Sequence, residues 1–140
     1  MREESLDALG RLVAIDFKRI GQWRMSETGL DFASDHRVTE PNVLYAFVSG
    51  REVLYVGKTS RPIAKRLYGY QNPGKMQLTN VYCNREICRL LTEKRPVEVF
   101  VRHAEKLSRI GSFAINEAAA LEDAIIRELR PPWNRTGKKR

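Results

Sequence analysis

Two short apolar runs decide the fold: VLYAFV at residues 43–48 and VLYVG at residues 53–57. Both are rich in β-branched and aromatic residues, which favour strands, and the SGRE stretch between them is typical of a turn. The pair therefore predicts a β-hairpin. Because side chains alternate between the two faces of a strand, each strand should present one set together: Val43, Tyr45 and Phe47 on the first, and Val53, Tyr55 and Gly57 on the second.

Helical patterns follow the hairpin. Ser60 and Pro62 are start signals for a helix to about Tyr70, and the QNPG stretch at 71–74 ends it. A second helix is expected over residues about 78–93, and a third strand over VEVFV at 97–101. Residues 113–130 have a helical pattern that Pro131-Pro132 ends.

The first 41 residues give a weaker signal. Residues about 4–20 carry apolar side chains at helical spacing, which predicts one amphipathic helix. Residues 21–41 are polar and irregular, and a linker, an arm and a partner surface all fit them. We therefore expect a helical extension and linker at 1–41, a core domain at 42–134 and a short basic tail at 135–140.

The composition is that of one basic domain. A chain of 140 residues with 42% hydrophobic content can bury a single core. It has 25 Lys+Arg against 17 Asp+Glu, a net charge of +8 and a pI of about 9.8, so a polyanion is the natural partner. Charge alone does not decide this, because basic proteins of other kinds are common.

Cysteines, histidines and hydropathy exclude several classes of protein. Cys83 and Cys88 are five apart, which fits neither a disulfide framework nor the spacing of a zinc site, so we expect both to be reduced and structural. His36 and His103 are far apart, and no structural zinc is predicted. There is no signal-peptide core and no run near the ~20 apolar residues that span a bilayer. A cytoplasmic protein without a membrane partner is expected.

Glu122 is the most informative single residue. At 3.6 residues per turn it falls near the middle of an apolar face made by Ala114, Ile115, Ala118, Leu121, Ile125, Ile126 and Leu129. A carboxylate in such a place is normally paired, protonated or bound to a metal, because burying an unpaired charge is costly. A buried ion pair or the edge of a cleft explains it as well as a metal does.

Four polar residues indicate a shared site only when they are considered together: Tyr45, Tyr55, Arg66 and Tyr70. Alone, the two strand tyrosines suit a half-buried sheet and Arg66 is typical of a solvated helix charge. Arg66 and Tyr70, however, lie one turn apart on the helix that follows the hairpin, so their side chains can converge on one point.

The stretch Gly57-Lys58-Thr59 invites comparison with a nucleotide-binding phosphate loop. That pattern requires a glycine five positions before Gly57, and Glu52 stands there. The loop is also too short to cradle phosphates, which excludes an NTPase.

In order and spacing, these residues resemble the motif set of the GIY-YIG endonucleases. The set comprises Leu44-Tyr45-Ala46, then Tyr55-Val56-Gly57-Lys58, then Arg66, Tyr70, Glu122 and Asn134, the last within Pro-Pro-Trp-Asn. The first triplet of the family name is Val43-Leu44-Tyr45 here and the second is Tyr55-Val56-Gly57, so both keep their tyrosine. Tyr70 stands where many members carry histidine and is similar to the variant seen in excision-repair nucleases.

The resemblance covers residues about 42–134 and implies an α/β fold. That fold is a small, mainly antiparallel three-stranded sheet flanked by helices, here with an N-terminal helical extension. The local strand and helix patterns agree with it.

The resemblance also implies roles in phosphodiester cleavage. Glu122 would be the protein ligand of a single Mg²⁺ (or Mn²⁺), since Mg²⁺ binds through one or two carboxylates plus phosphate oxygens and keeps several waters. Arg66 would hold the phosphate with its permanently charged fork. Tyr55 would bond a phosphate oxygen, Gly57 would allow close backbone approach, and the amide of Asn134 would hold the shape of the site.

The general base is left open among Tyr45, Lys58 and Tyr70. A phenol with a pKa near ~10 is a poor base at neutral pH unless nearby positive charge lowers that pKa. Lys58 is the candidate source of such charge for Tyr45.

The basic segment at residues 71–95 separates the site helix from the third strand. We expect Lys75, Arg85 and Arg89 to contact the DNA backbone, although a charge-rich helix is usually a solvated face.

The sequence therefore predicts a metal-dependent endonuclease that hydrolyses phosphodiester bonds of DNA, restriction-like in role. Cutting both strands would ask for a homodimer, because one active site cuts one strand. Two alternatives remain: an inactive nucleic-acid-binding module, and a repair or recombination nuclease that reads DNA structure. An inactive binding module is disfavoured because the site residues are all present, namely Tyr45, Tyr55, Arg66, Glu122 and Asn134. Tyr70 slightly favours the repair or recombination nuclease.

Overall fold

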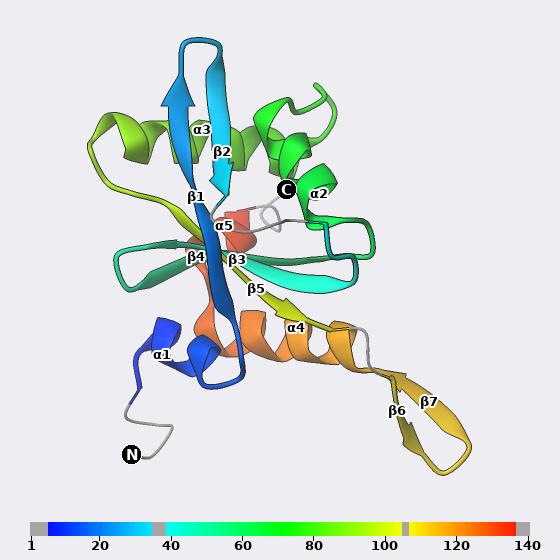
Figure 1. The fold of residues 1–140 in the computed structure, drawn as a ribbon. Helices are drawn as coiled ribbons and strands as arrows, with labels where there is room; N and C mark the ends of the chain where they lie inside the picture. The colour runs from blue at the N-terminus through cyan, green and yellow to red at the C-terminus, as the bar shows by residue number, and fades with distance from the viewer. Residues whose placement is uncertain (1–5, 35–38, 105–106, 137–140) are drawn as a thin grey trace.

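An antiparallel sheet of five strands forms the middle layer of the structure, a computed structural model that describes residues 6–34, 39–104 and 107–136 (Figure 1). Across the sheet the strand order is β2-β1-β5-β3-β4. The strands are β1 (Lys18–Ser26), β2 (Gly29–Ser34), β3 (Val43–Ser49), β4 (Glu52–Thr59) and β5 (Glu98–His103). The predicted hairpin and third strand are confirmed as β3, β4 and β5.

Helices cover both faces of this sheet (Figure 1). One face packs on α2 (Ile63–Gln71) and α3 (Leu78–Thr92), which confirms both predicted helices, and Trp133 of α5 (Pro132–Thr136) joins this core. The opposite face packs on α1 (Ala8–Val13) and α4 (Glu117–Leu129). Tyr45 and Tyr55 belong to the first face. The α/β class is confirmed, and no helix among the described residues is long and apolar enough to cross a membrane.

The sheet has five strands where three were predicted, because residues 18–34 form the two additional strands β1 and β2. This corrects two predictions: the N-terminal helix ends at Val13 rather than near residue 20, and much of the stretch at 21–41 is a regular hairpin. The pairing of β1 with β5 shifts register between Arg19 and Gly21, so the buried Ile20 and Trp23 do not follow a period of two. Residues 35–38 lie outside the described part of the chain, and the proposed division at residue 41 stays a prediction.

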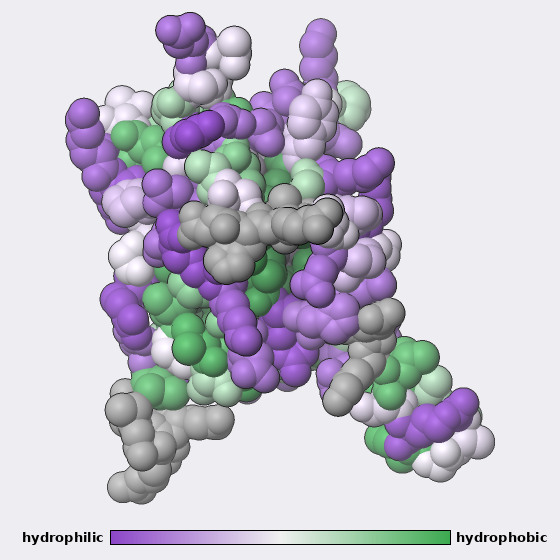
Figure 2. All heavy atoms as spheres, viewed as in Figure 1, coloured by the Kyte–Doolittle hydropathy of each residue, from purple (hydrophilic) through white to green (hydrophobic). Residues whose placement is uncertain are grey.

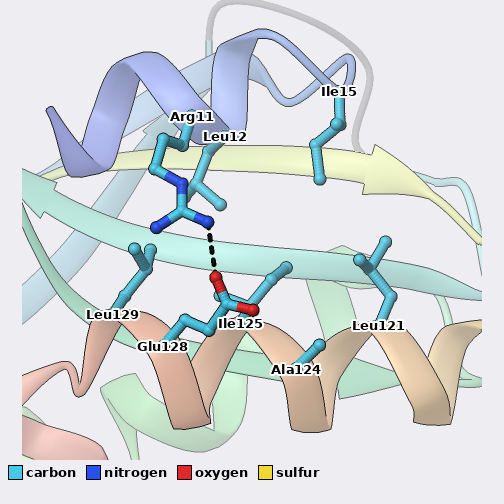
Figure 3. Close-up of a pocket in the computed structure, with 8 residues that line it drawn as sticks. All are labelled: Arg11, Leu12, Ile15, Leu121, Ala124, Ile125, Glu128 and Leu129. Atoms are coloured by element: carbon cyan, nitrogen blue, oxygen red, sulfur yellow. Dashed lines mark hydrogen bonds and ion pairs between the residues drawn. The ribbon is translucent and has the colours of Figure 1, made fainter. Parts of the chain in front are cut away.

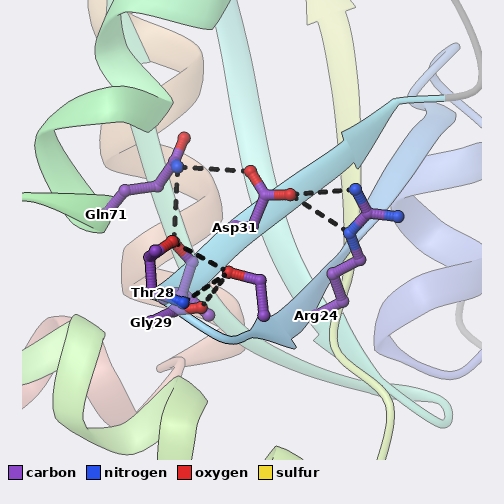
Figure 4. Close-up of polar contacts among 7 residues, drawn as sticks. Arg24, Thr28, Gly29, Asp31 and Gln71 are labelled. Carbon is purple, nitrogen blue, oxygen red and sulfur yellow. Dashed lines mark hydrogen bonds and ion pairs between the residues drawn. The ribbon is translucent and has the colours of Figure 1, made fainter.

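The β1–β2 hairpin is tied to the end of α2 (Figure 4). The guanidinium of Arg24 donates to Asp31 across the hairpin at 3.0 and 3.1 Å. The side-chain amide of Gln71 donates to the backbone carbonyl of Leu30 at 3.3 Å. These bonds brace the helix that carries Arg66 and Tyr70 against the far end of the sheet.

The first helix packs against α4 (Figure 3). Leu12 and Ile15 face Leu121, Ile125 and Leu129 across a small pocket of about 170 Å³, and Arg11 pairs with Glu128 at 2.5 Å. This contact supports the helix that carries Glu122.

A register shift in the β3–β4 pairing corrects one predicted face. Phe47 pairs with Tyr55 but Val48 pairs with Val53, so Leu54 is an extra residue in β4. Val53 therefore lies in the core under α1 and α4, on the face opposite Tyr55.

The predicted helix at 113–130 begins four residues later than expected. Residues Phe113–Asn116 form β7, which pairs with β6 (Leu107–Ile110) in a separate two-stranded sheet. Asn116 caps α4 by accepting a hydrogen bond from the backbone of Ala119 at 3.0 Å, and a cap of this kind fixes the start of a helix. Ala114 and Ile115 therefore do not belong to the helix face on which Glu122 lies.

Candidate active site

A chain of hydrogen bonds joins Tyr45, Tyr70 and Arg66. Tyr45 comes from the central strand β3 and Tyr70 from the last turn of α2, and their hydroxyls lie 2.7 Å apart. Arg66, one turn earlier on α2, donates from Nη2 to the Tyr70 hydroxyl at 2.7 Å, and its guanidinium carbon lies 4.3 Å from the centre of the Tyr70 ring. The predicted convergence of Arg66 and Tyr70 is confirmed, and Tyr45 joins them.

Gly57 makes room for this cluster. It pairs with Tyr45 across the β3–β4 ladder, and a Cβ at this position would lie 2.7 Å from both Cζ and the hydroxyl oxygen of Tyr45. Tyr55, two residues earlier on β4, has its ring centre 6.3 Å from that of Tyr45. Any larger residue at 57 would displace one of the two tyrosines.

Glu122 lies on α4. Its side chain is half-buried, in the middle of the helix. Burial is the main cause that raises the pKa of Tyr55, and the carboxylate of Glu122 adds to that rise. The acid and this phenol are therefore within electrostatic reach of each other, although α4 packs on the other face of the sheet.

The phenols are held in their neutral form. Burial raises the pKa of Tyr45 above its ordinary value, Tyr55 adds to the rise, and the Arg66 guanidinium opposes it. Burial likewise raises the pKa of Tyr70 well above its ordinary value, with Tyr45 and Tyr55 adding to it. From the sequence alone, nearby positive charge could lower the pKa of Tyr45. In the structure that pKa is raised, because the effect of burial is larger than that of the Arg66 guanidinium.

Lys58 is exposed at the end of β4 and lines an open groove of about 650 Å³ beside the cluster. Arg66 lines the same groove, together with Asn42, Val43, Thr59, Ser60, Arg61, Ala104, Leu107, Asn116 and Ala118. The groove thus has three cationic side chains, those of Lys58, Arg61 and Arg66. A phosphate group placed there would meet all three charges.

Asn134 lies behind the site, at the outer edge of β4. Its side-chain amide accepts a hydrogen bond from the backbone N–H of Val56 and donates one to the carbonyl of the same residue, both at 2.8 Å. Tyr55 and Gly57 flank Val56. The amide therefore fixes the part of the edge strand that carries them, while its role in the site stays a proposal.

Asn80 is a part of this arrangement that the sequence reasoning missed. It is buried on α3, and its Oδ1 accepts a hydrogen bond from Arg66 at 3.1 Å. Its amide nitrogen donates to Gln77 at 3.2 Å, which fixes the amide's orientation. A signal was present: Asn80 shares the buried face of its helix with Cys83, Ile87 and Leu90. A polar residue on an apolar helix face is the same cue that singled out Glu122.

The basic residues of α3 and the turn before it lie apart from the groove. Arg89 pairs with Glu86 at 2.9 Å and with Glu93 at 3.1 Å, and Arg85 stacks 5.4 Å from the ring centre of Tyr82. Lys75 is exposed before the helix. None of Lys75, Arg85 and Arg89 lines the groove, and their contact with DNA stays a prediction.

The donors near the site fit a hard divalent cation held by one carboxylate. Among the described residues there is no group of three or more His, Cys, Asp or Glu side chains that could hold a metal. Mg²⁺ does not need one, because it binds through one or two carboxylates and fills its shell with water and phosphate oxygens. Cys83 and Cys88 are free thiols, and burial raises the pKa of Cys83 to about 12.

Comparisons with known proteins support the fold. No family model matches the sequence. Over 98 residues, or 69% of the chain, it is 35% identical to the UvrABC system protein C of Alkalilimnicola ehrlichii, and it spans only 13% of that protein's length. Its fold is similar to that of a mutant of bacteriophage T4 EndoII, with a TM-score of 0.70 and 19% identity over 91% of this chain and 98% of that one.

A more distant structural likeness is to the restriction endonuclease HPY188I in complex with product DNA. The TM-score is 0.49 and the identity 15%, over 80% of this chain and 72% of that one.

Proposed function

We propose that this chain, which resembles the GIY-YIG nucleases in motif order and in fold, is a metal-dependent endonuclease that hydrolyses phosphodiester bonds of DNA. One observation carries the proposal: Tyr45, Tyr70 and Arg66 form a hydrogen-bonded cluster at a cationic groove. The charge of Glu122 acts on Tyr55 at the same place. An ordinary packed core does not need a guanidinium bonded to one of two linked, buried phenols at the edge of a groove.

Arg66 is suited to the charge that develops on the phosphate. Its Nη2 is held by Tyr70 and Asn80, so the guanidinium faces the groove without having to reorganise during the reaction. Fixed donors of this kind stabilise a transition state more than mobile ones do. Lys58, exposed in the groove, adds a second positive charge for the substrate backbone.

Glu122 would be the protein ligand for one Mg²⁺ or Mn²⁺ ion. Such an ion neutralises charge on the phosphate and makes a bound water more acidic. The half-buried carboxylate of Glu122 would supply the negative charge that holds the cation. Tyr55, whose pKa the charge of Glu122 helps to raise, would donate a hydrogen bond to a phosphate oxygen.

Tyr45 and Tyr70 act as neutral hydroxyls in this proposal. Because burial raises the pKa of both, neither is ionised at neutral pH, and each can orient a water or donate a hydrogen bond. Among the three candidate bases this speaks against Tyr45 and Tyr70.

DNA is the proposed substrate because the chain is strongly basic and resembles nucleases of the GIY-YIG type in motif order. The net charge is +8, and the groove beside the cluster is cationic. A restriction-like role would need a homodimer for two-strand cutting. The sequence likeness to a UvrABC system protein C favours the alternative of a repair nuclease, which would nick one strand.

Nicking of supercoiled plasmid tests the proposal. We expect relaxation in Mg²⁺ or Mn²⁺, none after chelation with EDTA, and none with Glu122→Gln. Asp123→Asn is the matched control, because Asp123 neighbours Glu122 on α4 but is exposed and paired with Arg127. Tight, salt-sensitive binding without cutting in any divalent metal would instead identify an inactive binding module.

A further inference from the structure

The β6–β7 hairpin forms an arm that projects from the body of the protein (Figure 1). Paired residues of a ladder share a face and alternate residues repeat it, so the arm has two unlike faces. One face carries Leu107, Arg109, Ala114 and Asn116, and the other carries Ser108, Ile110, Phe113 and Ile115.

The face that carries Arg109 continues the wall of the cationic groove. Leu107 and Asn116, the pair at the base of the arm, line that groove together with its three cationic side chains. Arg109 is the next residue of β6 on this face, about 7 Å farther along the strand. It is exposed, and Figure 2 shows strongly hydrophilic atoms beside hydrophobic ones on this projecting segment. The positive charge of the groove therefore extends onto the arm.

The cations along this surface are not neutralised by acids. Within residues 6–34, 39–104 and 107–136, no carboxylate forms an ion pair with Lys58, Arg61, Arg66 or Arg109. Arg109 donates from Nη1 to the backbone carbonyl of Ser112 at 3.0 Å. That bond leaves the other N–H donors of its guanidinium for a ligand.

Arginines elsewhere on the described surface mostly have an acid partner. A carboxylate oxygen lies within 4.0 Å of Arg11, Arg19, Arg24, Arg51, Arg85, Arg89, Arg95, Arg102 and Arg127. Arg130 has none among the described residues, but it is the C-cap of α4, next to the negative end of a helix. Unpaired cations are thus concentrated in the groove and on the arm.

A polyanion is the ligand that fits such a surface. Like charges repel one another, and a bound polyanion relieves that repulsion while it releases counterions. Each strand of a duplex carries a phosphate about every 3.4 Å along the helix axis, so a duplex that places one phosphate at Arg66 presents others along the groove. A second copy of this chain, with its net charge of +8, would bring positive charge to positive charge.

We propose that the face of the arm defined by Leu107, Arg109 and Asn116 binds the phosphodiester backbone of the substrate. Arg109 holds a phosphate other than the one at Arg66, because its planar fork suits phosphate oxygens. Ile110 and Phe113 lie on the opposite face and take no part in this contact. The inference rests on the proposed function for its substrate class and adds a binding residue outside the candidate active site.

The dependence of DNA affinity on salt tests this contact. The chain is titrated in EDTA, at several salt concentrations, into a short fluorescent duplex and followed by anisotropy. We expect Arg109→Gln to weaken binding about eightfold at about 0.1 M salt and to reduce the slope of log affinity against log salt by about 0.9, as for one lost phosphate contact. Arg127→Gln is the matched control. It removes the same charge from an exposed arginine that pairs with Asp123 outside the groove, so it should bind as the wild type does.

Arg109→Lys separates the charge of Arg109 from its bond to Ser112 in the turn. We expect the lysine variant to recover most of the affinity and the salt slope, because an ammonium still binds phosphate as a point charge. Circular dichroism and sedimentation should be the same for Arg109→Gln and the wild type.

Three results would overturn the inference. One is an Arg109→Gln variant that binds as tightly as Arg127→Gln. Another is weaker binding with an unchanged salt slope, or a loss that lysine does not restore, which would assign Arg109 to the shape of the turn. The third is a change of oligomeric state in Arg109→Gln, which would make this face a surface between copies of the chain.

The two proposals fail separately. Binding that depends on Arg109, by a chain that cuts nothing in any metal, would refute the proposed nuclease and leave the arm standing. Metal-dependent cutting by a chain whose affinity for the duplex ignores Arg109 would refute the arm and leave the nuclease standing. A wild-type chain that binds no duplex would refute both.

Discussion

The side-chain amide of Asn134 forms two hydrogen bonds of 2.8 Å with the backbone of a single residue, Val56. In this way a side chain from the C-terminal helix α5 takes the place that a further strand would occupy at the edge of β4. Tyr55 and Gly57, which flank Val56, thereby have a fixed position.

Asn134→Ala should destabilise the protein and the site together. The N–H and carbonyl of Val56 would lose their partners, at a cost of about 1–3 kcal/mol in the free energy of unfolding. Chemical denaturation measures this, and the nicking rate should fall at temperatures where the variant is still folded. Asn72→Ala, at an exposed position after α2, is the control. Equal stability of the two variants would contradict the edge-strand role of Asn134.

Gly57→Ala should disrupt the tyrosine cluster. The added methyl would lie 2.7 Å from Tyr45, closer than packed atoms approach, so Tyr45 or the strand must shift. Overpacking of this kind costs about 1–3 kcal/mol, and we expect a nicking rate well below that of the wild type. Gly74→Ala is the control, because a Cβ there would meet only the flexible side chain of Gln77, at 3.3 Å. A fully active Gly57→Ala would show that the close approach has no function.

The stability of the protein should fall in alkali because of Tyr45. Its pKa is raised in the folded protein, mainly by burial, so the unfolded chain ionises first. The contribution of Tyr45 to the free energy of unfolding is complete below the ordinary tyrosine pKa of about 10. It is lost as the pH rises above that value.

Chemical unfolding of the wild type and of Tyr45→Phe between pH 9 and 11, values chosen about the ordinary tyrosine pKa, measures this effect. We expect the free energy of unfolding of the wild type to fall more steeply with pH than that of Tyr45→Phe, at the upper end of this pH range. Tyr68→Phe should behave as the wild type, because Tyr68 is 61% exposed. Parallel curves for Tyr45→Phe and wild type would mean that the buried phenol ionises as readily as a free one.

Asn80→Ala should reduce turnover more than substrate binding. Arg66 would keep Tyr70 as a partner but lose the bond that ties it to α3. We expect kcat to fall about tenfold with little change in KM, as for a group that acts on the transition state through another. Asn80→Ser should restore part of the rate, because a hydroxyl can still accept from Arg66. An effect on KM alone would assign Asn80 to binding or to folding.

Strong local patterns made much of the fold and the site predictable. The β3–β4 hairpin, the two helices after it and β5 each carry a dense run of strand formers or clear helix signals, and motif order singled out the cluster around Tyr45. Residues 18–34 were missed because a register shift next to Gly21 breaks their alternation. The arm was missed because its short β7 continues directly into α4, where Asn116 is the cap.

Long-range contacts explain the remaining gaps. The extra residue at Leu54, which turns Val53 to the other face, is visible only in the pairing of β4 with β3. The bond between Asn80 and Arg66 joins α3 to α2, and no local pattern states which side chain a buried amide will meet.

A double-variant cycle on nicking rate tests the central claim most directly, namely that Arg66 and Glu122 serve one phosphodiester site. Single-turnover rates in Mg²⁺ are compared for wild type, Arg66→Ala, Glu122→Gln and the double variant. Residues that act as one unit are strongly non-additive, so we expect each single change to remove most of the activity and the double change to remove little more. Wild-type rates in either single variant, or losses that simply multiply, would contradict a shared site.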